Sequence, residues 1–200
     1  ANVIVNGGDF IQNGLGVNSL GGDITSTTDG IAFATAVTLT NAVAMATGAG
    51  VGDDIVFTST VEGTVVDTQT LTLDSGAAGN ITFGDTVGAG TSLGAVTIAN
   101  AANVTATGTF GAASFTQNAG TGITDFQDAI TTTVGNFAFI GNNLTISSVN
   151  PSTIAGSMTV TNAGTFTTGA TADVTVNGGE FIQNGLGVNS LGGDITSTTD

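Results

Sequence analysis

Hydrophobic residues recur at every second position over many short stretches of the chain, often with threonine between them. VTL at 37–39, LTL at 71–73 and ITF at 81–83 are examples. An alternation with period two is typical of β-strands that bury one face. The residues between these stretches are mostly Gly, Asn, Asp and Ser, which tolerate tight turns and positive φ angles. No segment shows a helical period with caps, so the sequence predicts an all-β protein. The same alternation returns at 96–98, 144–146, 158–160 and 174–176.

A second motif indicates how the strands are connected. A Val-rich strand is followed by an Asn-Gly or Asn-Ala-Gly turn and then by a phenylalanine, in NGGDF, NAGTF and NGGEF. This order predicts a strand, a sharp corner and a second strand whose Phe returns to the core. Asn side chains at such corners can bond to the coils above and below. The corner residues singled out are Asn6, Gly8, Asn162, Gly164, Asn177 and Gly179, and the core phenylalanines are Phe10, Phe83, Phe139, Phe166 and Phe181.

Two architectures fit short strands of this kind. In a parallel β-solenoid (β-helix) each coil of two or three strands stacks on the previous coil, about 4.8 Å away. In a string of tandem β-sandwich domains, each domain of about 100 residues would close its own core. The short strands, the Asn-Gly corners and the lack of Trp, Tyr, Cys and a linker favour the solenoid. The segments 47–54 and 121–136 interrupt the alternation and are interpreted as inserts.

The chain begins and ends on nearly the same sequence. Residues 1–29 and 172–200 are identical except at Asn2/Asp173, Ile4/Thr175 and Asp9/Glu180. Residues that we expect on the surface recur as faithfully as apolar ones, which indicates a duplication rather than a selected site. We therefore expect one long repeat unit at 1–171, the start of the next unit at 172–200, and a window of a longer tandem array.

The composition excludes several classes of partner and chemistry. The 200 residues include no Lys, Arg, His or Cys, and the formal net charge is -15. Nucleic-acid binding requires cationic side chains, so nucleic acid is not expected as a partner. No apolar run is long enough for a transmembrane helix, so membrane insertion of this segment is not expected. We expect no disulfides and no thiol chemistry.

The carboxylates are the remaining candidates for chemistry. Each must face water, accept hydrogen bonds from N–H groups or bind a cation, because no cationic side chain exists. Asp53 with Asp54, and Asp125 with Asp128, are the candidate calcium ligands, although neither known calcium-loop spacing is present. Solvated acids are the alternative that we favour. The same pairs lack a His, a cation or an aromatic platform, so we expect no enzyme and no cofactor other than this calcium alternative.

The Thr/Asn/Gly-rich texture of LTLDSGAAGNITF and TVTNAGTF, free of Lys and Arg, resembles large repetitive bacterial surface proteins. These are the filamentous-haemagglutinin-like and β-strand-repeat adhesins. The resemblance lies in repeat style, covers the whole chain and implies secretion and a β-helical shaft. We therefore expect a structural shaft or fibre at the extracellular cell surface that associates with itself through tandem repeats or head-to-tail stacking. The alternative is an adhesin whose solenoid binds glycans or other cells.

Overall fold

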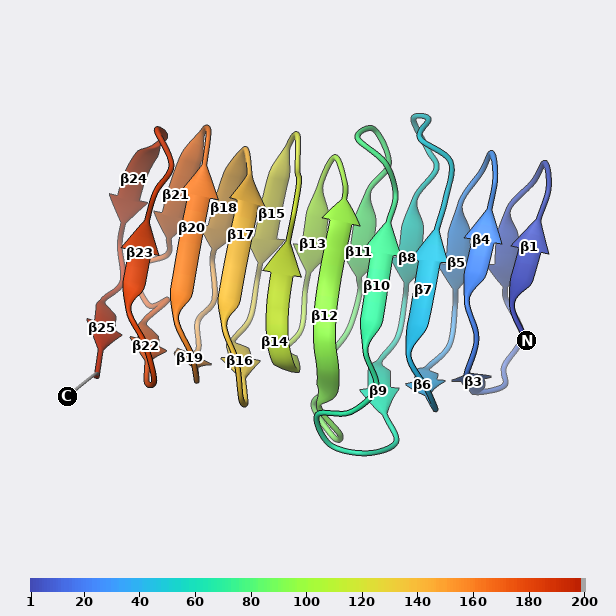
Figure 1. Ribbon diagram of the computed structural model, residues 1–200, viewed down its shortest axis with the longest axis horizontal. Helices are drawn as coiled ribbons and strands as arrows, with labels where there is room; N and C mark the ends of the chain where they lie inside the picture. Colours follow the sequence, from blue (N-terminus) through green and yellow to red (C-terminus); the bar gives the residue numbers. More distant parts are fainter. Residues whose placement is uncertain (199–200) are drawn as a thin grey trace.

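The computed structural model describes residues 1–198 and confirms the parallel β-solenoid; Thr199 and Asp200, the last residues of the second copy, lie outside the described residues. All paired strands of this part run parallel, and it contains no helix. The chain winds through nine coils whose strands line three faces (Figure 1). A coil is one turn of the solenoid, and the faces are numbered 1 to 3 in the order in which the chain visits them.

Each face is a ladder of one strand per coil. Face 1 contains β1 (Val3–Val5), β4 (Ile24–Ser26), β7 (Val43–Ala46), β10 (Leu71–Asp74), β12 (Leu93–Asn100), β14 (Phe110–Gln117), β17 (Phe137–Gly141), β20 (Met158–Asn162) and β23 (Phe181–Gln183). Face 2 contains β2 (Phe10–Gln12), β5 (Ile31–Phe33), β8 (Ile55–Phe57), β11 (Ile81–Phe83), β13 (Val104–Ala106), β15 (Ile123–Phe126), β18 (Asn143–Ile146), β21 (Thr165–Thr168) and β24 (Val188–Leu191).

Face 3 is the least regular of the three. It contains β3 (Asn18–Leu20), β6 (Val37–Leu39), β9 (Val61–Gly63), β16 (Ile130–Thr132), β19 (Ser152–Ile154), β22 (Val174–Val176) and β25 (Ile195–Ser197). Between β9 and β16 the ladder passes through one residue, Val87, which bridges to Val61 and to Phe110, and then through the first residues of β14. Because β14 pairs first on face 3 and then on face 1, hydrogen bonding joins face 1 with β16, β19, β22 and β25 into one 13-stranded sheet, whereas β3, β6 and β9 form a separate 3-stranded sheet.

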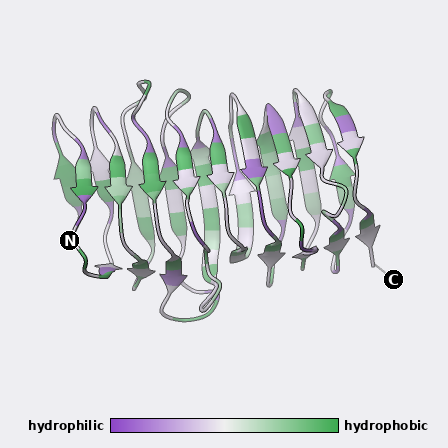
Figure 2. Cartoon of the chain, turned by 180° about the vertical axis from the view of Figure 1, so that it is seen from behind, coloured by the Kyte–Doolittle hydropathy of each residue, from purple (hydrophilic) through white to green (hydrophobic). Residues whose placement is uncertain are grey.

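The core is a continuous apolar column. Most three-residue strands bury their outer two positions and expose the middle one in part, as the alternation predicts. Phe33, Phe57 and Phe83 stack in successive coils with ring centroids 5.7 and 5.4 Å apart and ring planes within 4°. Seen from behind, hydrophobic segments run from coil to coil along the whole length (Figure 2). The coils therefore share one core instead of closing separate ones.

The predicted core phenylalanines lie at different depths of this column. Phe83, Phe139 and Phe166 are fully buried. Phe10 and Phe181 belong to the first and last coils and are partly buried against the core.

Coil length varies although the strands stay in register. Stacked partners are 19 residues apart at Val96–Phe115 and 28 apart at Val43–Leu71. The extra residues lie in loops at 47–54 and 64–70. The interpretation of 121–136 as an insert is wrong, because this segment forms β15 and β16 and pairs on both sides.

We predict that Phe57→Ala destabilises the solenoid by about 3–5 kcal/mol, because a fully buried ring that packs between two others leaves a cavity. Urea unfolding followed by far-ultraviolet circular dichroism measures this loss. Val51→Ala is the control, since Val51 is 92% exposed and should change stability by less than about 0.5 kcal/mol. Equal effects of the two substitutions would contradict a continuous stacked core.

Candidate functional site

The corner between faces 1 and 2 carries a ladder of side-chain hydrogen bonds. The backbone N–H and the Nδ2 of Asn80 donate to Oδ1 of Asp54 over 2.7 and 3.0 Å. Asn103 then donates from Nδ2 to Oδ1 of Asn80 over 2.8 Å. Its own Oδ1 accepts the N–H of Ile123 over 2.9 Å. Four successive coils are thus joined by side chains in addition to the backbone ladder.

Further along this corner, glycine occupies positions where a side chain from the previous coil fills the space that a Cβ atom would need. At Gly122 an added Cβ would meet Oδ1 of Asn103 and the carbonyl oxygen of Ala102. At Gly164 it would meet Oδ1 of Asn143, which accepts the N–H of Thr165 over 2.8 Å. The corner therefore pairs an amide or carboxylate in one coil with a small residue in the next.

The corner residues proposed from sequence do not take equal parts in these bonds. Asn162 is 1% exposed; its Nδ2 donates to the carbonyl of Gly164, and its Oδ1 accepts from Nε2 of Gln183 over 2.7 Å. Asn177 is exposed, and within residues 1–198 its side chain has one hydrogen bond, in which its Oδ1 accepts the hydroxyl of Thr198 over 3.3 Å. Asn6 is exposed and makes no side-chain hydrogen bond within residues 1–198. Gly8 and Gly179 lie in the corresponding turns, before β2 and β23.

The four candidate calcium ligands accept hydrogen bonds from the protein itself. Asp53 lies in the 47–54 loop, is 8% exposed and accepts the N–H of Gly50 over 2.8 Å. Asp54, its neighbour, is engaged by Asn80. The two carboxylates therefore serve different partners.

Asp125 and Asp128 lie three coils further along the solenoid. Asp125 accepts the hydroxyl of Ser147 over 2.9 Å, and Asp128 accepts the N–H of Ala129 and Nδ2 of Asn150, each over 2.7 Å. Within residues 1–198 no three acidic side chains come together as a metal-ligand group. Among these residues no buried side-chain nitrogen or oxygen lacks a partner.

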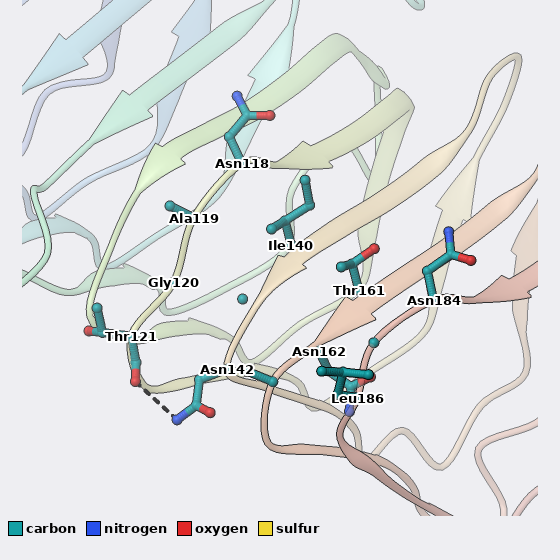
Figure 3. Close-up of a pocket in the computed structure, with 13 residues that line it drawn as sticks. Asn118, Ala119, Gly120, Thr121, Ile140, Asn142, Thr161, Asn162, Asn184 and Leu186 are labelled. Carbon is teal, nitrogen blue, oxygen red and sulfur yellow. Dashed lines mark hydrogen bonds between the residues drawn. The ribbon is translucent and has the colours of Figure 1, made fainter.

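A groove of about 760 Å³ lies along the corner between faces 1 and 2 in the last four coils (Figure 3). Its rim is an in-register row across four coils: Asn118, Ile140, Thr161 and Asn184. Small residues such as Ala119, Gly141 and Gly185 make it concave. No titratable side chain lines the groove, so it offers amide hydrogen bonds and apolar contact but no acid–base chemistry.

Sequence reasoning missed a strap, formed by residues 64–70, at the corner between faces 3 and 1. The loop at 64–70 turns at Asp67, whose φ is 58°, and Oδ1 of Asp67 accepts the hydroxyls of Ser92 and Thr133, both over 2.6 Å. Gln69 is 5% exposed, and its Oε1 accepts the N–H groups of Thr64 and Val65. The strap thus links coils whose residues are far apart in sequence. The only signal was the long gap between the strands at 61–63 and 71–74.

Comparisons with protein-family models, with curated proteins and with solved structures find no match for this chain. In the described part of the chain no helix could span a membrane.

We predict that Asn162→Val costs about 1–3 kcal/mol, because it removes both hydrogen bonds of a buried amide. The Gly164 carbonyl then keeps only the N–H of Val188, and Nε2 of Gln183 keeps only the carbonyl of Gly185. Asn177→Val is the matched control at the same place in the motif. It should change the free energy of unfolding by less than about 0.5 kcal/mol, since Asn177 is exposed. Urea melts of both variants test the difference, and a larger loss at Asn177 would refute the assignment.

Proposed function

We propose that this chain is part of a structural, extracellular β-solenoid shaft or fibre on a bacterial cell surface. The observation that carries the proposal is the seam between the repeat units. Within residues 1–198 the second copy stacks on the first unit in register on all three faces, Val174 on Ser152, Phe181 on Met158 and Val188 on Thr165. A repeat that adds coils without interrupting the ladder serves to add length.

The mechanism is mechanical. Backbone hydrogen bonds run along the axis between every pair of coils, and the stacked core runs inside them. The negative charge of every ionised side chain limits lateral association of shafts at low salt. The lack of Lys and Arg leaves no bond for a trypsin-like protease. These properties, with the resemblance to repetitive surface proteins, favour a load-bearing role outside the cell.

The corner groove supports a second function, adhesion. Its volume suits a small ligand, and its rim of Asn118, Thr161 and Asn184 offers amide and hydroxyl groups of the kind that bind sugar hydroxyls. It lacks the aromatic platform expected of a glycan site, which is why the shaft is the leading proposal.

Immunogold electron microscopy of intact source cells, with antibodies against this chain, tests the shaft. We expect gold along surface fibres whose power spectrum contains a layer line for a repeat of about 4.8 Å along the axis. Label confined to the cytoplasm would refute the proposal. Soluble chain added as a competitor separates the two functions, because it should reduce attachment to other cells only if the protein is an adhesin.

A further inference from the structure

The two copies of the repeated segment occupy different faces of the solenoid. In the first copy β1 lies on face 1, β2 on face 2, β3 on face 3 and β4 on face 1. Their counterparts, 171 residues later, are β22 on face 3, β23 on face 1, β24 on face 2 and β25 on face 3. Every strand of the second copy is therefore displaced by one face (Figure 1).

Two local contacts of the segment are the same in both copies. Val3 pairs with Ile24 as Val174 pairs with Ile195. The hydroxyl of Ser26 donates to the carbonyl of Gly8 over 2.8 Å, and the hydroxyl of Ser197 donates to the carbonyl of Gly179 over the same distance. The segment thus folds in the same way wherever it enters the cross-section.

Equivalence of the three faces makes this possible. Each face accepts a three-residue strand that buries its first and third positions, as β4, β8 and β22 do on faces 1, 2 and 3. The corners are set by bonds between neighbouring coils and not by a property of one face. From β1 to β20 the chain completes seven coils and is again on face 1. It then crosses to face 2 at β21 and to face 3 at β22. One unit therefore spans seven and two-thirds turns.

We propose that successive units of a tandem array are each rotated by two-thirds of a turn, so that surface features point in three directions before they repeat. This inference rests on the tandem array of the proposed shaft and not on the cellular location of that shaft. Three units make 23 turns, which is about 110 Å at about 4.8 Å per coil. In the array the second unit continues from the edge formed by β23, β24 and β25.

In the array the occupant of that edge is the rest of the second unit, whose sequence repeats that of the first. In the first copy β5 covers β2, with Phe10 and Phe33 rings 5.4 Å apart, and β6 covers β3. In the second copy Phe181 is only partly buried, and Val188 and Leu191 are 69% and 51% exposed. The counterparts of β5 and β6 cover these residues when they enter on faces 1 and 2.

The rotation decides where each unit displays its most exposed apolar side chain. Leu15 and its counterpart Leu186 are both fully exposed, at 100% and 101%. Leu15 lies at the corner between faces 2 and 3, after β2, whereas Leu186 lies at the corner between faces 1 and 2, after β23. A third copy places this leucine at the remaining corner, between faces 3 and 1, so the array displays it at all three corners in turn.

The rotation is testable within the 200-residue chain, which contains no cysteine of its own. Leu186 and Asn142 line the same groove, at the corner between faces 1 and 2. Val149, exposed at the corner between faces 2 and 3 of the same coil as Asn142, is the matched control. With pyrene on both cysteines, we expect several-fold more excimer emission from L186C/N142C than from L186C/V149C. The reverse order would overturn the rotation, because an unrotated copy places Leu186 at the corner of Val149.

A chain of three units, residues 1–171 three times followed by 172–200, extends the test to the array. Gold is attached at Leu15→Cys in every unit, and single rods are reconstructed by cryo-electron tomography. We expect gold at three azimuths about 120° apart, with an axial step of about 37 Å.

Two outcomes of the tomography oppose the proposal. Rods with one straight row of gold would overturn the rotation while leaving the shaft intact. Failure to form a continuous rod would overturn it as well, since the rotated junction would then not close. Cytoplasmic immunogold label would instead refute the shaft and leave the rotation standing.

Discussion

The structure depends on one constraint: every coil must pair its backbone with the coil before it, in parallel and in register. Residues at equal positions then lie directly above one another at the spacing of strands in a sheet. Residues of the same type therefore stack on one another in successive coils, as Phe33, Phe57 and Phe83 do. The same stacking aligns the corner side chains into a hydrogen-bonded ladder. Asn80 donates to Asp54 in the previous coil, and Asn103 donates to Asn80.

Stacking also explains how a chain without cations accommodates its acids. Carboxylates placed above one another would repel, and no Lys or Arg is present to separate them. In the middle coils an amide follows the acid instead, with Asn80 next to Asp54 and Asn150 next to Asp128. The amide donates to the carboxylate and so replaces the missing cation. The second copy is an exception, because Asp173 replaces Asn2 and lies one coil below Asp194; there the backbone N–H of Asp194 donates to Oδ1 of Asp173 over 2.9 Å.

The faces were predictable because most inward positions are apolar, and the errors arose where they are not. Thr124 and Thr132 are each 2% exposed, and their hydroxyls donate to Oε1 of Gln117 and to the carbonyl of Gly135, each over 2.8 Å. Two buried polar residues hid the alternation of β15 and β16, so 121–136 resembled an insert. The strap at 64–70 could not be predicted from the sequence for another reason. Its bond from Thr133 to Asp67 joins coils through a tertiary contact that no local pattern encodes.

The displaced second copy shows which information in this sequence is local and which is not. A strand of alternating residues fits any of three equivalent faces, and a corner needs only suitable neighbours in adjacent coils. Nothing in the repeated segment therefore specifies the face on which it begins. A duplication need not span a whole number of turns to be accepted, because the ladder continues wherever the new strand meets a paired edge. The unit length sets the direction in which each copy points, and irregular coils such as those at 47–54 and 64–70 change that length in residues without changing the turn count. Loops can thus grow at the corners while the shaft inside keeps its register.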